Sequence, residues 1–268
     1  MNEDLRGKVA IVTGGSGGIG KGVALRLAAR GASVVVNGRS AGRGEAAVDE
    51  IRRLGGTAVF AAGDVRSNVD MASVVAAAVQ HFGGVDIVVA NAGGDDDEAR
   101  RPDVRGPFAD IDLARVTRFI GQAVASKLLI VQAAIRPMRQ RGGGSVVFIT
   151  SEGGRVASPG QTAIATFSGG LIMASKVLAK ELARDRIRVN CVCVTVVRDT
   201  PSWDAVFARD GVVSDQHRKQ YEKITARSPL GLASPADIGR VAAFLASDDS
   251  AYLTGASVSP TGGLTIHN

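Results

Sequence analysis

Short runs rich in β-branched residues alternate with longer alanine-rich segments along almost the whole chain. The predicted strands are residues 9–13, 33–36, 57–60, 85–89, 145–149, 187–192 and a last one near 257–258, and the predicted helices are 18–30, 45–54, 68–82, 113–139 and 162–184. Strands that are apolar throughout and alternate with helices are typical of a parallel sheet covered on both faces. Right-handed connections then predict an α/β fold with a doubly wound sheet.

The chain has 268 residues, without an obvious linker or internal repeat, which favours a single domain over residues 1–268. The net charge is +6, but no run of five basic residues occurs and aromatic residues are only 4%, which argues against nucleic acid as a partner. No apolar stretch approaches the ~20 residues of a membrane span, and the polar N-terminus is unlike a signal peptide. We therefore expect a cytoplasmic protein with no membrane partner.

Cysteine and histidine usage predicts neither a disulfide nor a metal site. Cys191 and Cys193, the two cysteines, lie two positions apart in an apolar run, so in a strand both point to one face and stay reduced. The three histidines, His81, His217 and His267, are far apart in the sequence. No metal motif is present.

A glycine-rich turn follows the first predicted strand and opens the first helix. Its sequence is Thr13-Gly14-Gly15-Ser16-Gly17-Gly18-Ile19-Gly20. Glycines let the backbone approach a pyrophosphate closely, and the helix N-terminus offers free N–H groups and a partial positive charge. The strand–turn–helix context makes this a strong prediction of dinucleotide binding.

The end of the second strand predicts which dinucleotide is bound. A carboxylate at this place would bind a ribose 2′-hydroxyl, whereas arginine favours a 2′-phosphate. Gly38 stands where an acid could sit, and Arg39 follows it. The sequence thus favours NADP(H) over NAD(H). The complete set of predicted cofactor-contacting residues is Gly14, Ser16, Gly17, Gly18, Ile19, Gly20, Arg39, Asp64, Val65, Asn91, Ala92, Gly93 and Thr200.

Four motifs together resemble the short-chain dehydrogenase/reductase family over about residues 7–263. They are the Thr-Gly-x-x-x-Gly-Ile-Gly turn, Asp64-Val65, Asn91-Ala92-Gly93 and Ile187-Arg188-Val189-Asn190. The resemblance implies a Rossmann-like sheet of seven strands and a nicotinamide cofactor held by about residues 7–110. It also implies a small-molecule substrate and a homodimer or homotetramer.

Members of this family use a serine, a tyrosine with a lysine four residues later, and a helix asparagine. The tyrosine passes a proton to the substrate oxygen, the lysine lowers the tyrosine pKa, the serine holds the carbonyl and the asparagine anchors a water relay. Ser151 matches the serine, but Ile164 and Ser168 occupy the tyrosine and lysine positions and Ala123 occupies that of the asparagine. The resemblance therefore extends to cofactor binding, while the usual proton donor is missing.

No other tyrosine restores the pair, since Thr225 and Ala256 stand four residues after Tyr221 and Tyr252. The candidate catalytic residues that remain are Ser151, Glu152 and Ser168. Glu152 serves acid–base chemistry if an apolar pocket raises its pKa, and otherwise faces solvent at a loop start.

Lys127 and Tyr221 are weaker candidates for the site. Lys127 would reach toward the pocket or lie on a surface or subunit interface, and Tyr221 would act as a surrogate acid or pack a lid. The lid is predicted at about residues 198–230. The charged segment 93–107 follows a strand end, where ligands bind, yet is also typical of a solvated loop.

Three functions remain open from the sequence. The first is an NADP(H)-dependent oxidoreductase with altered chemistry, such as hydride addition to an activated C=C bond with Ser151 holding the conjugated carbonyl. The second is a non-redox enzyme on the same fold (a cyclase, dehydratase or lyase). The third is an NADP(H)-binding pseudoenzyme or sensor. Fold alone does not separate them, because function depends on the site.

Overall fold

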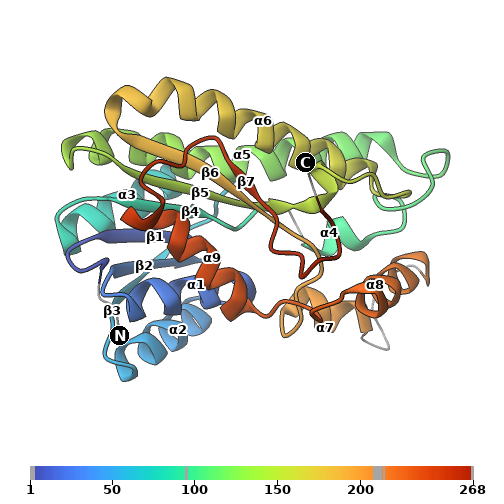
Figure 1. The fold of residues 1–268 in the computed structure, drawn as a ribbon, viewed down its shortest axis with the longest axis horizontal. Coiled ribbons are helices and arrows are strands. Elements are labelled where there is room, and N and C mark those ends of the chain that lie inside the picture. Colours follow the sequence, from blue (N-terminus) through green and yellow to red (C-terminus); the bar gives the residue numbers. More distant parts are fainter. Residues whose placement is uncertain (1–3, 94–95, 208–212, 214, 267–268) are drawn as a thin grey trace.

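The computed structural model describes residues 4–93, 96–207, 213 and 215–266, and its centre is one seven-stranded parallel sheet (Figure 1). The strand order is β3-β2-β1-β4-β5-β6-β7. The order reverses between β1 and β4, which is the switch point of a doubly wound sheet. The predicted Rossmann-like fold of about seven strands is confirmed. The parts of the predicted lid and of segment 93–107 that fall at 208–212, 214 and 94–95, and also His267, lie outside the described residues.

The strands and helices follow one another as the sequence alternation predicted. The strands are β1 (Val9–Thr13), β2 (Ser33–Gly38), β3 (Thr57–Ala62), β4 (Ile87–Ala90), β5 (Gly144–Ser151), β6 (Ile187–Val194) and β7 (Ser257–Val258). The helices are α1 (Gly18–Ala29), α2 (Ala41–Arg53), α3 (Asn68–Phe82), α4 (Asp96–Arg100), α5 (Leu113–Gln140), α6 (Thr162–Leu182), α7 (Pro201–Phe207), α8 (Asp215–Arg227) and α9 (Pro235–Ala246). Three short 3-10 turns are η1 (Glu152–Gly154), η2 (Ala183–Asp185) and η3 (Asp248–Ser250).

Alternate residues of β1 supply two separate apolar cores, one on each face of the sheet. Ala10 and Val12 belong to the core that α1, α2 and α9 cover, whereas Val9 and Ile11 belong to the core that α3, α5 and α6 cover. Side chains of a strand alternate between the two faces, so a strand buried on both sides is apolar at every position. This explains why the first strand appears in the sequence as a continuous apolar run.

Local capping explains where two helices differ from expectation. The helix predicted at 45–54 begins at Ala41, because the Ser40 side chain accepts from the Arg43 N–H and caps it. Helix α9 was not predicted. Its signal was present in the sequence, since Ser234 and Asp237 form a reciprocal capping box and Pro235 opens the helix.

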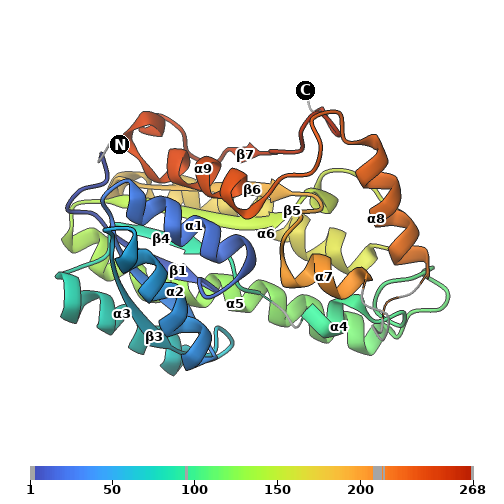
Figure 2. The ribbon, with the colours of Figure 1, turned by 90° about the horizontal axis from the view of Figure 1, so that it is seen from below.

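Helices α5 and α6 are the longest helices described and lie against each other on one face of the sheet. By length and hydropathy alone, α5 and the segment Thr162–Asp185 also reach the range of membrane-spanning helices, which the sequence analysis did not anticipate. Their apolar faces contribute Ile130 and Ile172 to the core below them. Helices α7 and α8 lie with α4 at the opposite end from the N-terminus (Figure 2).

The two cysteines are free thiols buried in β6. Burial raises the pKa of Cys191 to about 11 and that of Cys193 to about 12. Both therefore stay protonated and unreactive at neutral pH.

Candidate functional site

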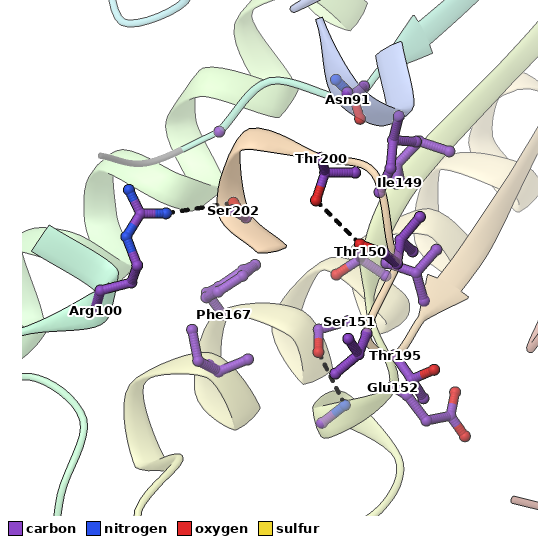
Figure 3. Close-up of a pocket in the computed structure, with 18 of the residues that line it drawn as sticks. Asn91, Arg100, Ile149, Thr150, Ser151, Glu152, Phe167, Thr195, Thr200 and Ser202 are labelled. Atoms are coloured by element: carbon purple, nitrogen blue, oxygen red, sulfur yellow. Dashed lines mark hydrogen bonds between the residues drawn. The ribbon is translucent and has the colours of Figure 1, made fainter. Parts of the chain in front are cut away.

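A cavity of about 1150 Å³ lies at the carboxyl ends of the strands, at the switch point of the sheet. This is where ligands bind in doubly wound folds. One end of the cavity is lined by the glycine-rich turn and Arg39, and the other by Ser151, Ile164 and residues of α7 and α8. Figure 3 shows the second end. One continuous cavity thus joins the predicted cofactor region to the predicted catalytic region.

The glycine-rich turn presents backbone N–H groups to the cavity. Gly14 and Gly18 adopt the left-handed region, with φ of 65° and 48°, and Gly17 caps α1 without offering a side-chain acceptor. The first N–H groups of α1 therefore lack a side-chain acceptor from the N-cap and favour an anion. A Cβ on Gly17 would meet nothing within 4 Å, whereas one on Gly20 would lie 2.2 Å from the Gly14 carbonyl oxygen. The space next to Gly17 is therefore open to a ligand. Gly20 lets the start of α1 pack closely against the backbone of Gly14.

Three arginines, Arg39, Arg43 and Arg66, gather at the end of β2. Arg66 binds the Asp64 carboxylate, with its Nε 2.9 Å from Oδ1, and lowers the pKa of Asp64 to about 2. Within the described chain, Arg39 and Arg43 form no ion pair with a carboxylate. A Cβ on Gly38 would lie 2.8 Å from the Ser16 hydroxyl oxygen, so this position has little room for an acidic side chain. The charge of Arg39 also contributes to the lowered pKa of Asp64, and with Arg43 it makes this end of the cavity suitable for an anionic group.

The end of β4 is fastened to β1 by polar contacts. The Thr13 hydroxyl accepts from the N–H groups of Asn91 and Ala92 at 3.0 and 3.1 Å, and the Asn91 amide nitrogen donates to the Thr13 carbonyl oxygen at 3.1 Å. Asn91 therefore holds the strand end in place and lines the cavity with Ala92 and Gly93. The other predicted cofactor contacts, Ser16, Ile19, Val65 and Thr200, also line the cavity.

Lys127 is buried beneath the end of β4 and lines the cavity, which is the first of the two alternatives that the sequence left open and differs from the surface or interface position that the sequence favoured. It is 4% exposed, and its Nζ donates to the carbonyl oxygens of Ala90 at 3.3 Å and Asn91 at 2.6 Å. A Cβ on Gly93 would lie 2.9 Å from Lys127 Cε, so glycine is required there for the lysine to pass. The buried ammonium obtains its hydrogen bonds from main-chain carbonyls, which satisfies the rule for buried charge.

Ser151 and Ile164 both line the other end of the cavity, next to Gly153. A methyl group added at Gly153 would lie 3.4 Å from both Ser151 Oγ and Ile164 Cγ2. The Ser151 hydroxyl oxygen accepts from the Gly153 N–H at 3.1 Å (Figure 3). Its own proton finds no acceptor in the described part of the chain, so it remains available to a ligand. Gln161 and Phe167 also line this end and were not singled out from the sequence.

Ser168 and Ala123 lie outside the cavity, contrary to the expectation that Ser168 faces the site. Ser168 is fully buried where α6 packs on η1, and a Cβ on Gly154 would lie 2.8 Å from Ser168 Cβ. Ala123 is buried in α5, in the apolar cluster that Phe167 and Ile164 join. The close approach of Gly154 separates Ser168 from the cavity.

Glu152 is buried, in contrast to the solvent-facing alternative. It is 4% exposed, and its carboxylate accepts from the hydroxyls of Ser259 at 2.6 Å and Thr265 at 2.9 Å. Figure 3 shows the carboxylate pointing away from Ser151. The residue lines the cavity wall but directs its charge toward the C-terminal segment.

Segment 93–107 is not simply a solvated loop. It contains α4, and Val104 is buried in the cluster that also contains Phe119. Arg100 and Arg105 line the cavity, and the Arg105 Nη2 donates to Gln220 Oε1 at 3.0 Å. This segment therefore contacts the predicted lid and supplies two cations to the site that sequence reasoning missed.

The predicted lid contributes an aromatic group from α7 and α8. The rings of Trp203 and Tyr221 stack at 6.2 Å, and His217 meets Tyr221 edge-on at 4.9 Å. Burial first, then the charges of Arg105 and Arg100, lower the pKa of His217 to about 3. His217 is therefore neutral at physiological pH, and Tyr221 is the tyrosine of the chain that lines the cavity.

Comparison with known proteins gives matches along nearly the whole chain. The family model described as enoyl-(acyl carrier protein) reductase matches residues 14–265. The chain is 36% identical over 262 residues to an uncharacterized oxidoreductase of Methylorubrum extorquens, covering 97% of this chain and 98% of that protein. It is 35% identical over 266 residues to the 3-oxoacyl-[acyl-carrier-protein] reductase of Chlamydia muridarum, covering 98% of this chain and 100% of that one.

A solved structure gives the same result. A 7α-hydroxysteroid dehydrogenase complexed with NADH and 7-oxo glycochenodeoxycholic acid superposes with a TM-score of 0.85 at 30% identity, covering 98% of this chain and 96% of that one. The sheet order, the glycine-rich turn at the switch point and these matches agree with one another. The chain belongs to the short-chain dehydrogenase/reductase family and is an oxidoreductase of that type.

Proposed function

We propose that the protein is an NADP(H)-dependent oxidoreductase that reduces a conjugated small molecule without a tyrosine–lysine pair. The observation that carries this proposal is the neighbourhood of Ser151 and Ile164 around Gly153: a hydroxyl with an available proton lies near an apolar side chain at the position where the family has its proton donor. The proposed setting is the cytoplasm, as a homodimer or homotetramer.

The preference for NADP(H) rests on the end of β2. Arg39 and Arg43 would bind the 2′-phosphate, and the N-terminus of α1 would bind the pyrophosphate through its backbone N–H groups. Asn91, Ala92 and Gly93 line the cavity with small or short side chains, which would let the backbone pass close to the ribose. When bound, NADPH supplies the hydride.

The chemistry that suits this wall is addition to an activated C=C bond. Hydride transfer to the β-carbon of an enone moves the electron pair onto the carbonyl oxygen as an enolate, and a solvent proton then completes the product. The Ser151 hydroxyl would donate to that oxygen and stabilise its developing charge. Ile164 would pack against the apolar part of the substrate. A simple ketone needs a proton delivered to its oxygen, which neither residue supplies at neutral pH.

The test is an NADPH oxidation assay at 340 nm with matched substrates. We expect cyclohexenone-type enones to be reduced and the corresponding saturated ketones to remain unreacted. Ser151→Ala removes one hydrogen bond to the oxyanion and lowers kcat by roughly 10²-fold or more. Ser73→Ala, at an exposed serine of α3 outside the cavity, is the matched control and retains the wild-type rate.

The other functions correspond to defined results of the same experiment. Tight NADPH binding without oxidation by any enone contradicts the proposal and favours a pseudoenzyme or sensor. Product formation with no change at 340 nm favours a cyclase, dehydratase or lyase. Reduction of saturated ketones at the enone rate would show that another group delivers the proton.

A further inference from the structure

Arg105 is a cation held in the cavity wall without an anionic partner among the described residues. Its Nη2 donates to Gln220 and its guanidinium contacts the Tyr221 side chain, but its Nε is fully buried and has no acceptor. Burial lowers the pKa of Arg105, yet a guanidinium stays charged in proteins. A buried charge is costly unless it is paired, so this position is explained best by a partner that arrives with a ligand.

The surroundings of Arg105 add positive charge. Lys219, Lys223 and Arg227 of α8 line the same cavity, and none of them forms an ion pair within the described chain. The described acidic residues that line the cavity are Asp64, which Arg66 binds at the far end, and Glu152. Glu152 directs its carboxylate to Ser259 and Thr265. The end of the cavity near α8 is therefore cationic.

His217 lies in the same field. The ring centroids of His217 and Tyr221 are 4.9 Å apart. Burial is the main cause that lowers the pKa of His217, and the charges of Arg105 and Arg100 lower it further. Arg100 and Arg105 thus add positive charge beside the His217 ring. An anionic group entering the cavity would be attracted to this end.

We infer that the guanidinium of Arg105, which lines the cavity, binds an anionic group of the substrate, a carboxylate or a phosphate. The inference rests on the proposed function for the identity of the bound molecule as a substrate. The carbonyl would lie at Ser151 and the anion at Arg105, with the apolar surface of Ile164 and Phe167 along the cavity between α6 and α7. The substrate class is a conjugated carbonyl compound that carries an acidic group.

The single tryptophan of the chain makes this testable without turnover. Trp203 stacks on Tyr221, which contacts Arg105, so Trp203 fluorescence reports on this end of the cavity. The probes are succinate, inorganic phosphate and the neutral succinamide, each titrated with the cofactor region saturated by NADP⁺. We expect a saturable response to succinate or phosphate and none to succinamide. The stronger of the two anions identifies the group.

Two substitutions separate charge from packing. Arg105→Gln weakens anion binding at least tenfold, and Arg105→Lys retains part of it, because lysine keeps the charge but loses the planar fork. Arg118→Gln, an exposed arginine of α5 outside the cavity, leaves binding unchanged. An equal response from wild type and Arg105→Gln, or an equal response to succinamide, overturns the inference.

Failure of the anion site at Arg105 can be distinguished from failure of the proposed reductase function. NADPH affinity is measured on the same samples, and the titration is repeated without cofactor. If NADPH does not bind but succinate still changes Trp203 fluorescence through Arg105, the anion site stands and the redox proposal falls. If enones are reduced, a substrate acid should exceed its methyl ester at least tenfold in kcat/KM, and Arg105→Gln should remove this preference.

Discussion

The ammonium nitrogen of Lys127 lies 2.6 Å from the main-chain carbonyl oxygen of Asn91. A cation from the middle of α5 thereby stabilises the end of β4, at the strand edge where the cofactor is proposed to bind. It also contacts the Ala90 carbonyl oxygen at 3.3 Å and requires glycine at position 93. Lys127 thus supports the same strand end that the contacts between Thr13 and Asn91 hold.

Lys127→Met removes the donor and leaves these buried carbonyls without it. Each orphaned group costs about 1–3 kcal/mol, partly offset because a buried charge is also removed, so we expect the free energy of unfolding to fall by about 2 kcal/mol. Urea unfolding measures this. Lys176→Met, at an exposed lysine of α6, should change stability little. Equal stability of both variants and wild type would contradict a structural role for Lys127.

Arg39→Ala should weaken NADPH binding about tenfold and leave NADH binding unchanged. The variant loses one charge-assisted contact to the 2′-phosphate, and about 1.4 kcal/mol corresponds to a factor of ten. Calorimetric titration with both nucleotides gives the two affinities. Arg53→Ala, an exposed arginine of α2 outside the cavity, is the control. Equal weakening of both nucleotides would mean that Arg39 does not recognise the 2′-phosphate.

The stability of the protein should depend on His217 in mildly acidic solution. Its pKa is about 3 when folded, against a usual 6.5, so the unfolded chain binds the extra proton between these values. The stabilisation is therefore present above pH 6.5 and is lost as the pH falls toward 3. Between pH 7 and pH 5 this amounts to about 2 kcal/mol.

His217→Gln should remove this loss, because glutamine does not titrate. Urea unfolding at the two pH values, followed by Trp203 fluorescence, measures the difference between the variant and wild type. His81→Gln, at an exposed histidine of α3, should keep the wild-type pH dependence. A variant at position 217 with the same loss as wild type would show that the ring is accessible to protons in the folded state.

Met173→Glu should produce a monomer. Met173 and Val177 are 59% and 48% exposed one turn apart on α6, which leaves an apolar strip uncovered on a helix that already packs on the sheet. A charge in that strip opposes association of two copies. Light scattering after gel filtration gives the mass. Val79→Glu, on α3, should retain the wild-type mass, and a monomeric wild type would refute the predicted homodimer or homotetramer.

Much of the fold could be predicted from the sequence, because strand and helix positions depend on local patterns of apolar and capping residues. Strand β1 and helix α3 appear at the predicted residues, since burial on both faces makes a strand uniformly apolar and Ser67 and Gly83 mark the helix ends. Helix α4 was missed, because five residues rich in charge carry no apolar period. The capping box of Ser234 and Asp237 is a sequence signal for the start of α9.

The site was less predictable than the sheet, because it is built from long-range contacts. Ser151 stands at the end of a predicted strand and lines the cavity, but the burial of Lys127 depends on a strand end 36 residues away. Arg105 lies in a segment whose composition is that of a solvated loop, and its role depends on Gln220 of α8, 115 residues further on. Ser168 shares a helix with Ile164, yet the close approach of Gly154 excludes it from the cavity.

The Glu152 carboxylate accepts hydrogen bonds from Ser259 and Thr265, which are synthesised much later than Glu152 itself. The Thr265 contact spans 113 positions of the chain, which a ribosome needs on the order of ten seconds to add. During that interval the Glu152 carboxylate lacks these two hydroxyl donors. The glycine-rich turn can form early, whereas the wall opposite it is completed only when the final strand β7 and the segment after it have emerged. The cavity wall at the glycine-rich turn therefore forms before the wall that carries Glu152 receives its last contacts.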